Sequence, residues 1–125
     1  MDFKESKPIY MQIVDRICNE ILTGTYDEGG RVPSVREYAA IVEVNANTVV
    51  RSFDFLQNAN IIFNRRGIGY FVADGAKKQI MAMRREVFMN ESLPEFFNEI
   101  DVLNISIDEV AELYRKRVKS KVERV

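Results

Sequence analysis

Two helix-start signals, Ser34 and Asn45, stand close together in this 125-residue chain and leave room for only a short helix between them. Ser34 begins the motif Ser-Val-Arg-Glu, a capping box in which the serine oxygen and the Glu37 carboxylate satisfy helix N–H groups. Asn45 is a favoured N-cap residue. The spacing predicts a short helix, a tight turn and a further helix that runs to about Ala59.

The segments on either side of this helix pair differ in their periodicity. Isoleucine recurs every fourth residue from position 9 to position 21, which predicts an earlier amphipathic helix. A loop then leads into a short extended piece at Arg31 and Val32. Apolar runs at 61–63 and 70–72 enclose a glycine turn and predict a β-hairpin. The predicted fold class is mainly α with a small β-hairpin (α+β), in the layout of a winged helix-turn-helix.

The chain is predicted to divide into a winged helix-turn-helix DNA-binding domain at 1–75 and a short helical region at 76–125. A helical pattern covers 77–89, and the serine-to-glutamate capping spacing recurs at Ser92 and at Ser106. These signals predict three helices after the hairpin. We expect this region to serve dimerisation and to be a candidate region for an effector.

The second region, of about 50 residues, is too short to enclose a ligand-sized pocket alone, yet it carries many large apolar side chains that favour a partner. We expect a twofold homodimer, and the alternative is that these helices pack back onto the winged helix. The candidate dimerisation residues are Ile80, Met83, Val87, Phe88, Phe96, Phe97, Ile100 and Tyr114.

Composition excludes several functional classes. The chain has no histidine and a single cysteine, Cys18, which removes histidine-based catalysis and thiolate metal clusters within one chain. We therefore expect no enzyme activity, no cofactor and no metal. No run of apolar residues is long enough for a membrane span or a signal peptide, so we expect a cytoplasmic protein with no membrane partner.

A helical wheel of the third helix separates an apolar arc from a polar one. Val49, Phe53 and Leu56 fall on the arc that must face the core. Asn47 and Arg51 fall on the opposite arc, with Thr48 beside them. Asparagine and arginine suit bidentate contacts with adenine and guanine edges, so this helix is expected to read bases.

Arginines flank this helix on both sides. Arg36 lies in the first turn of the preceding helix, where it can reach bases or phosphates. In the hairpin, Arg65 and Arg66 precede Gly67, a pattern suited to phosphate or minor-groove contact. Residues 31–73 carry five basic and three acidic side chains, although the whole chain has a net charge of −1.

Each of these features also has a structural explanation. Asn47 and Thr48 can serve the helix N-terminus, Arg51 can pair with an acid, and the arginine pair can be a solvated turn. The alternative function is a winged helix that binds protein or RNA, which the near-neutral charge and Asp54 would favour.

Four motifs occur in the order found in one family of bacterial regulators. They are Pro-Ile-Tyr-Met-Gln-Ile from residue 8, Arg-Val-Pro-Ser-Val-Arg-Glu from 31, Val-Asn-Ala-Asn-Thr-Val from 44 and Arg-Arg-Gly-Ile-Gly-Tyr-Phe-Val from 65. The sequence resembles the GntR family over residues 8–73, and its short helical remainder resembles the YtrA subfamily. Pattern and resemblance together give these candidate DNA-binding residues: Ser34, Arg36, Asn45, Asn47, Thr48, Arg51, Arg65, Arg66 and Gly67.

The resemblance implies a homodimeric repressor that binds an inverted repeat in double-stranded operator DNA, near the promoter of a transporter operon that includes its own gene. A small-molecule effector between the subunits and ligand-independent repression are both compatible with it. The sequence departs from the subfamily at Ala46, where proline is frequent, and at Asp54 with Phe55, where a basic and an acidic residue are frequent. Because an acid at Asp54 would repel phosphate, we expect no contacts from the later turns of the third helix.

Overall fold

The computed structural model describes residues 7–123, which form two compact units. The first unit extends through Met83 and the second begins at Arg84. The sequence placed this boundary at Gly75; the first unit extends further because Ala76 and Ile80 are fully buried in its core.

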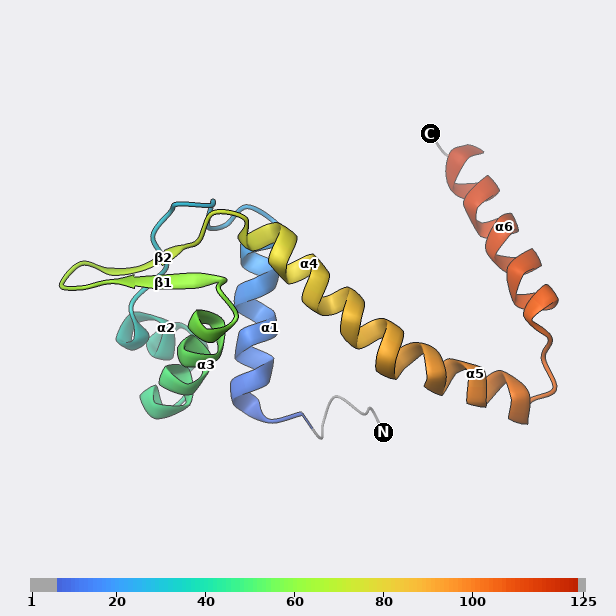
Figure 1. Cartoon of the computed structure of the whole chain (residues 1–125), viewed down its shortest axis with the longest axis horizontal. Coiled ribbons are helices and arrows are strands. Elements are labelled where there is room, and N and C mark those ends of the chain that lie inside the picture. Colours follow the sequence, from blue (N-terminus) through green and yellow to red (C-terminus); the bar gives the residue numbers. More distant parts are fainter. Residues whose placement is uncertain (1–6, 124–125) are drawn as a thin grey trace. The chain divides into compact units, whose positions relative to one another are not determined.

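The first unit has the element order of a winged helix-turn-helix (Figure 1). It comprises α1 (Ile9–Leu22), α2 (Val35–Val42), α3 (Ala46–Asn58), β1 (Ile62–Arg65), β2 (Gly69–Val72) and the first part of α4 (Ala76–Val87). The predicted fold class, mainly helical with one antiparallel hairpin, is confirmed.

Local capping defines the α2–α3 pair. The Ser34 hydroxyl oxygen accepts a hydrogen bond from the Glu37 N–H at 3.1 Å, and the Glu37 carboxylate accepts one from the Ser34 N–H at 2.8 Å. The predicted capping box is therefore present. Asn45 Oδ1 accepts from the Asn47 N–H at 2.8 Å and starts α3. Between the helices, Glu43 adopts a left-handed conformation with φ 56°, which makes the turn tight.

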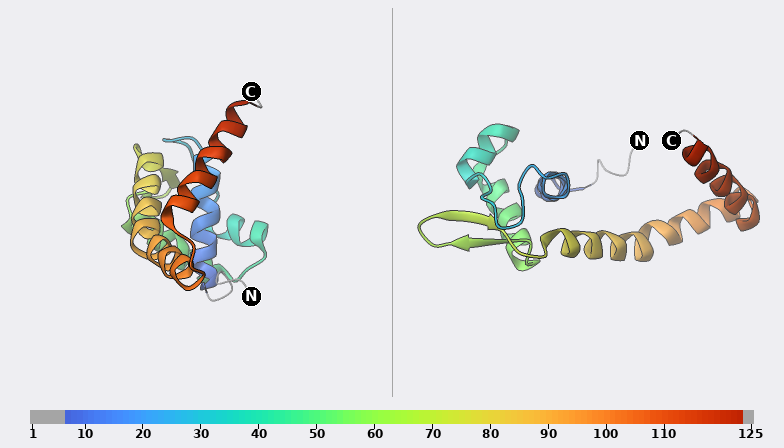
Figure 2. Two further views of the ribbon diagram at one scale, coloured as in Figure 1. Left: turned by 90° about the vertical axis from the view of Figure 1, so that its right-hand side faces the viewer. Right: turned by 90° about the horizontal axis from the view of Figure 1, so that it is seen from above.

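The hairpin pairs β1 with β2 in antiparallel register, with Phe63 opposite Phe71. The segment before α2 adds an isolated bridge to this two-stranded sheet: Arg31 bridges Phe71, and the Val32 N–H donates to the Tyr70 carbonyl at 2.9 Å. The extended piece predicted there is confirmed. Two perpendicular views show the hairpin tip pointing away from α1 (Figures 1 and 2).

The core of this unit lies between the helices and the hairpin. Phe53 of α3 is fully buried, and its ring meets Tyr70 edge-on with centroids 4.9 Å apart. Tyr38 of α2 is also fully buried, and its hydroxyl donates to Glu20 Oε1 at 2.8 Å. Burial and the negative charge of Glu20 raise the pKa of Tyr38, so this phenol stays protonated.

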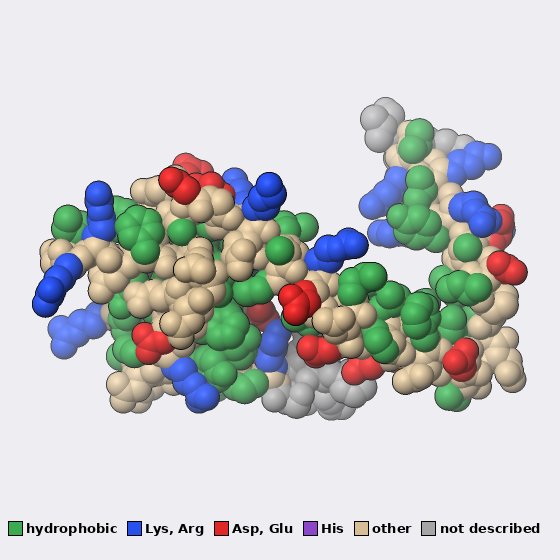
Figure 3. Space-filling model, in the orientation of Figure 1, with side chains coloured by type: hydrophobic (Ala, Val, Ile, Leu, Met, Phe, Trp, Pro, Cys, Tyr) green, Lys and Arg blue, Asp and Glu red, His purple; other side chains and the backbone are tan. Residues whose placement is uncertain are grey.

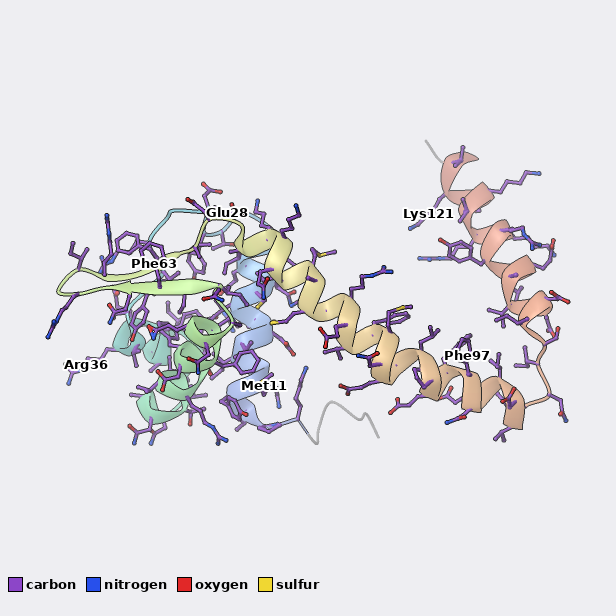
Figure 4. All side chains as sticks on the ribbon, in the orientation of Figure 1. Met11, Glu28, Arg36, Phe63, Phe97 and Lys121 are labelled. Atoms are coloured by element: carbon purple, nitrogen blue, oxygen red, sulfur yellow. The ribbon has the colours of Figure 1, made fainter. Side chains whose placement is uncertain are left out.

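A side chain from the loop after α1 caps α4. The Glu28 carboxylate accepts hydrogen bonds from the Gly75 N–H at 2.9 Å and the Lys77 N–H at 3.1 Å. Figure 4 shows Glu28 beside the start of this helix. These two backbone hydrogen bonds lower the pKa of Glu28 below its ordinary value. The direction of α4 at its first turn is thus set by a residue far away in the sequence.

The second unit contains the end of α4, a π-helical turn η2 (Phe88–Ser92), α5 (Leu93–Val102) and α6 (Ile107–Glu123). The helix predicted after Ser92 is present as α5, but the capping box predicted there is absent: the φ and ψ of Ser92 are helical, its side chain makes no capping hydrogen bond, and the chain passes from η2 into α5 without interruption. The start predicted at Ser106 is confirmed, because Ser106 Oγ accepts from the Glu109 N–H at 3.1 Å. In the described part of the chain, no helix is long and apolar enough to cross a membrane.

Candidate DNA interface

The outward face of α3 is polar in the way the helical wheel predicted. Val49, Phe53 and Leu56 are fully buried, whereas Asn47 and Arg51 are exposed. Thr48, which the wheel placed at the edge of the polar arc, is half-buried. Ser52, which the wheel did not single out, is fully buried, and its hydroxyl donates to the Tyr10 carbonyl at 2.8 Å. The polar arc therefore begins at Asn47 and includes Arg51.

Arg51 stacks on an aromatic ring from another helix. Its Cζ lies 4.0 Å from the centroid of the Tyr10 ring, in the first turn of α1. A guanidinium group that rests on an aromatic ring keeps its N–H groups in its own plane, where they remain available to donate. The sequence left open that Arg51 pairs with an acid; in the structure Arg51 makes a cation–π contact with Tyr10.

Ser34 and Asn45 use their side-chain oxygens inside the protein. Both oxygens accept the backbone N–H groups that begin α2 and α3. Glu37 completes the first cap, and the hydrogen bonds from Ser34 lower the pKa of its carboxyl group. The Ser34 hydroxyl hydrogen and the Asn45 amide hydrogens remain the groups through which these residues could donate to a phosphate.

Arg36 extends from α2 into solvent. It is exposed and lies in the first turn, next to the helix N-terminus, where backbone N–H groups point outward. Figure 4 shows its side chain directed away from the body of the first unit. A long cation at this position can approach the same surface that α3 presents.

The hairpin tip carries the arginine pair on a glycine turn. Arg65 and Arg66 are both exposed, and the Ile68 N–H closes the turn by donating to the Arg65 carbonyl at 2.9 Å. Gly67 has φ +77°, a conformation that favours glycine. The Arg65 Cζ lies 5.4 Å from the Phe71 ring centroid. In Figure 3, Lys and Arg side chains project around this end of the first unit.

Three residues that sequence reasoning did not select belong to this surface. Tyr10 lies under Arg51, a contact between distant segments that no local pattern reveals. Val50 is 43% exposed beside Asn47 and Arg51. Its place on the outward arc of the helical wheel could have identified it from the sequence. Arg31 runs beside the hairpin: a Cβ at Gly69 would lie 3.2 Å from Arg31 Nε. Glycine at 69 therefore lets this arginine lie against the turn end of the hairpin, where Gly69 pairs with Arg65.

The candidate dimerisation residues have unequal surroundings. Ile80 is fully buried in the first unit, Met83 packs against the same core, and Ile100 is 8% exposed. Ile80 therefore offers no surface to a partner, because its own chain already covers it. The remaining five are exposed: Val87, Phe88, Phe96, Phe97 and Tyr114. Exposed apolar neighbours that were not selected include Met89, Val102, Leu103, Ile107 and Leu113.

The fold and this surface define a winged helix-turn-helix protein that presents a polar helix face and basic flanks to a ligand. The model of the bacterial regulatory proteins of the gntR family matches residues 9–72. The chain belongs to the GntR family and is a DNA-binding transcriptional regulator, not an enzyme.

Similarity to known proteins extends beyond the winged helix. The HTH-type transcriptional regulator YhcF of Bacillus subtilis is 34% identical over 88% of this chain and 89% of its own length. The HTH-type transcriptional repressor YtrA of the same organism is 29% identical over 90% of this chain and 85% of its own length. The expected relation to the YtrA-like branch is confirmed.

A crystal structure of a GntR-family regulator from Bacteroides thetaiotaomicron has the same fold. It is 52% identical, superposes with a TM-score of 0.82, and the match covers 90% of this chain and 98% of that one. The similarity therefore includes the helices after the hairpin as well as the DNA-binding unit.

Proposed function

We propose that this regulator is a homodimeric repressor that binds an inverted-repeat operator. The α3 helix of each subunit would lie in the major groove of one half-site. The observation that carries the proposal is the outward face of α3, where Asn47, Val50 and Arg51 lie side by side and exposed above a closed apolar core. Within residues 7–123, no other candidate surface combines base-reading side chains with a helix held by a closed core.

Base reading is assigned to that face by chemistry. Arg51 can donate two hydrogen bonds to a guanine, and Asn47 can pair in the same way with an adenine. Val50 has no polar atom and suits contact with a thymine methyl group. Asp54 lies one turn further along and is exposed, so phosphate contact is expected to stop before it.

Phosphate contact is assigned to the flanks. Arg36 lies in the first turn of α2, and Arg65 and Arg66 lie at the hairpin tip. The turn at Gly67 brings backbone close to a duplex, which suits a minor groove or its edge. Such contacts position the protein and make binding depend on salt, but they do not select a sequence.

A homodimer is supported by the second unit. It carries many large apolar side chains that are exposed, among them Phe88, Phe96 and Phe97, and large exposed apolar patches mark sites of protein association. Figure 3 shows hydrophobic side chains following the helices of this unit. A second copy of the chain supplies the same surface, and a twofold dimer would place two α3 helices about one DNA turn apart, or a multiple of it.

The biological target is proposed by analogy. Repression is taken from the name of the YtrA relative, and a transporter operon that includes the regulator's own gene follows from the subfamily resemblance. A cytoplasmic location follows from this role. An effector of unassigned chemistry, bound between subunits, stays a prediction that a thermal-shift screen of the full chain would test.

The direct test is a mobility shift with the full chain and the DNA upstream of its own gene. We expect one dimeric complex on an inverted repeat, weaker binding to a single half-site, and little binding to a shuffled sequence of equal length. Double-stranded and single-stranded RNA of the same sequence serve as competitors. Preferential displacement by RNA, or equal binding to the shuffled duplex, would favour the alternative function.

A further inference from the structure

The contact between Arg51 and Tyr10 joins the DNA-reading helix to the first turn of α1. The Arg51 Cζ lies 4.0 Å from the ring centroid, close enough for a cation–π interaction. Arg51 is exposed and Tyr10 is half-buried, so the guanidinium rests on a ring that is itself partly embedded in the protein. We propose that Tyr10 is a positioning residue that holds Arg51 in its base-reading orientation.

The backbone of Tyr10 is held by the residue next to Arg51. Ser52 is fully buried, and its hydroxyl donates to the Tyr10 carbonyl at 2.8 Å, with the Thr48 carbonyl at 3.2 Å. Two consecutive residues of α3 therefore contact one residue of α1, Arg51 through the ring and Ser52 through the carbonyl. This double contact fixes the ring relative to the recognition helix.

The first turn of α1 is held from its other side as well. The Gln12 side-chain amide donates to the Lys7 carbonyl at 2.9 Å, and Lys7 forms an ion pair with Asp15. The Met11 and Gln12 N–H groups both donate to the Pro8 carbonyl. The ring of Tyr10 is thus attached to a helix start that these hydrogen bonds and this ion pair hold in place.

The consequence is a pre-organised arginine. An arginine side chain without such a contact samples many rotamers, and binding must select one of them. The Tyr10 ring contacts one side of the Arg51 guanidinium, whereas the N–H groups of the guanidinium remain available for a guanine. The inference rests on the proposed base reading by Arg51 and predicts that removal of the aromatic ring weakens discrimination without changing the phosphate contacts.

The test compares four variants in the full chain: Tyr10→Phe, Tyr10→Leu, Arg51→Ala and the double variant Tyr10→Leu with Arg51→Ala. Tyr10→Phe keeps the ring, and Tyr10→Leu keeps apolar bulk without it. The readout is the ratio of Kd values for the operator and for an operator changed at the base pair that Arg51→Ala identifies. Thermal melting checks that each variant is folded, and the salt dependence of binding reports on phosphate contacts.

We expect Tyr10→Leu to lower the discrimination ratio about two- to fivefold, Tyr10→Phe to retain it, and the salt dependence to stay unchanged in both. In the Arg51→Ala background, Tyr10→Leu should have no further effect, because the two residues act as one unit. If Arg51→Ala itself leaves discrimination intact, the base-reading assignment fails, and the role of Tyr10 with it.

If Arg51→Ala loses discrimination but Tyr10→Leu does not, only the positioning role is overturned. Sharper discrimination by Tyr10→Leu would also overturn it, because the ring would then restrain Arg51 away from the bases. Additive effects in the double variant would show that Tyr10 acts independently of Arg51 and would likewise contradict the inference.

Discussion

The two units of this chain treat their apolar side chains differently. In the first unit, Phe53, Tyr38 and Ile80 are fully buried by residues of the same chain. In the second, Phe97 is 44% exposed and Leu103 is 65% exposed. The first unit thus closes a core by itself, whereas the second leaves large apolar side chains exposed, and these are the surface that the proposed homodimer would cover. The difference suggests that stability is concentrated in one unit and association in the other.

The largest expected effect is on stability and comes from the core of the first unit. Phe53→Ala removes a fully buried ring and should lower the free energy of unfolding by about 3–5 kcal/mol. Phe97→Ala is the matched control, and at low protein concentration it should change stability by less than about 1 kcal/mol. Urea unfolding followed by circular dichroism measures both. Equal losses would contradict the difference between the units.

The next effect is on association and concerns the second unit. Replacing Phe96 and Phe97 together by serine should weaken the proposed dimer at least about thirtyfold, because buried aromatic residues contribute most to interfaces. Sedimentation at several concentrations measures it. Phe63→Ser, at a 42% exposed position of the hairpin, is the control and should leave the dimer intact. Dissociation by Phe63→Ser alone would place the interface on the first unit.

A smaller effect is expected on the salt dependence of DNA binding, which should differ between cations of the two units. Arg66→Ala should weaken binding to all DNA sequences and reduce the salt dependence by about one phosphate contact per subunit. Lys121→Ala, at an exposed cation of α6, should leave the salt dependence unchanged. Figure 4 labels this lysine on α6. The measurement is Kd at four or more salt concentrations. An unchanged slope for Arg66→Ala would remove the hairpin from the DNA contacts.

The smallest expected effect is on the pH dependence of stability and comes from Glu28, which caps α4. The pKa of Glu28 is lower in the folded protein than its ordinary value of 4.5. The ionised Glu28 side chain therefore stabilises the fold above pH 4.5, and this stabilisation is lost as the pH falls through the folded pKa. Glu28→Gln should therefore reduce the loss of stability between neutral and acidic pH. Glu86→Gln, at an exposed position of the second unit, is the control. Urea midpoints at pH 7 and below pH 4.5 measure the difference; identical pH dependence in wild type and Glu28→Gln would contradict it.

Most of the first unit was predictable because its signals are local. The capping box at Ser34, the cap at Asn45 and the glycine turn at Gly67 each involve residues within a few positions of one another. The α3 wheel correctly separated buried from exposed side chains because one helix face must meet the core. At Ser92 the same kind of local signal marked the start of α5 but not a cap, because the chain enters this helix directly from a π-helical turn.

The sequence by itself determined the order of elements, the family and the polar face of α3, since all three follow from residue types at short, regular spacings. Only the tertiary structure decided that Ile80 belongs to the core, that Glu28 caps α4 and that Tyr10 supports Arg51. Each of these contacts joins segments far apart in the chain. Their existence depends on how helices and loops pack in space, and spacing along the sequence carries no direct record of that.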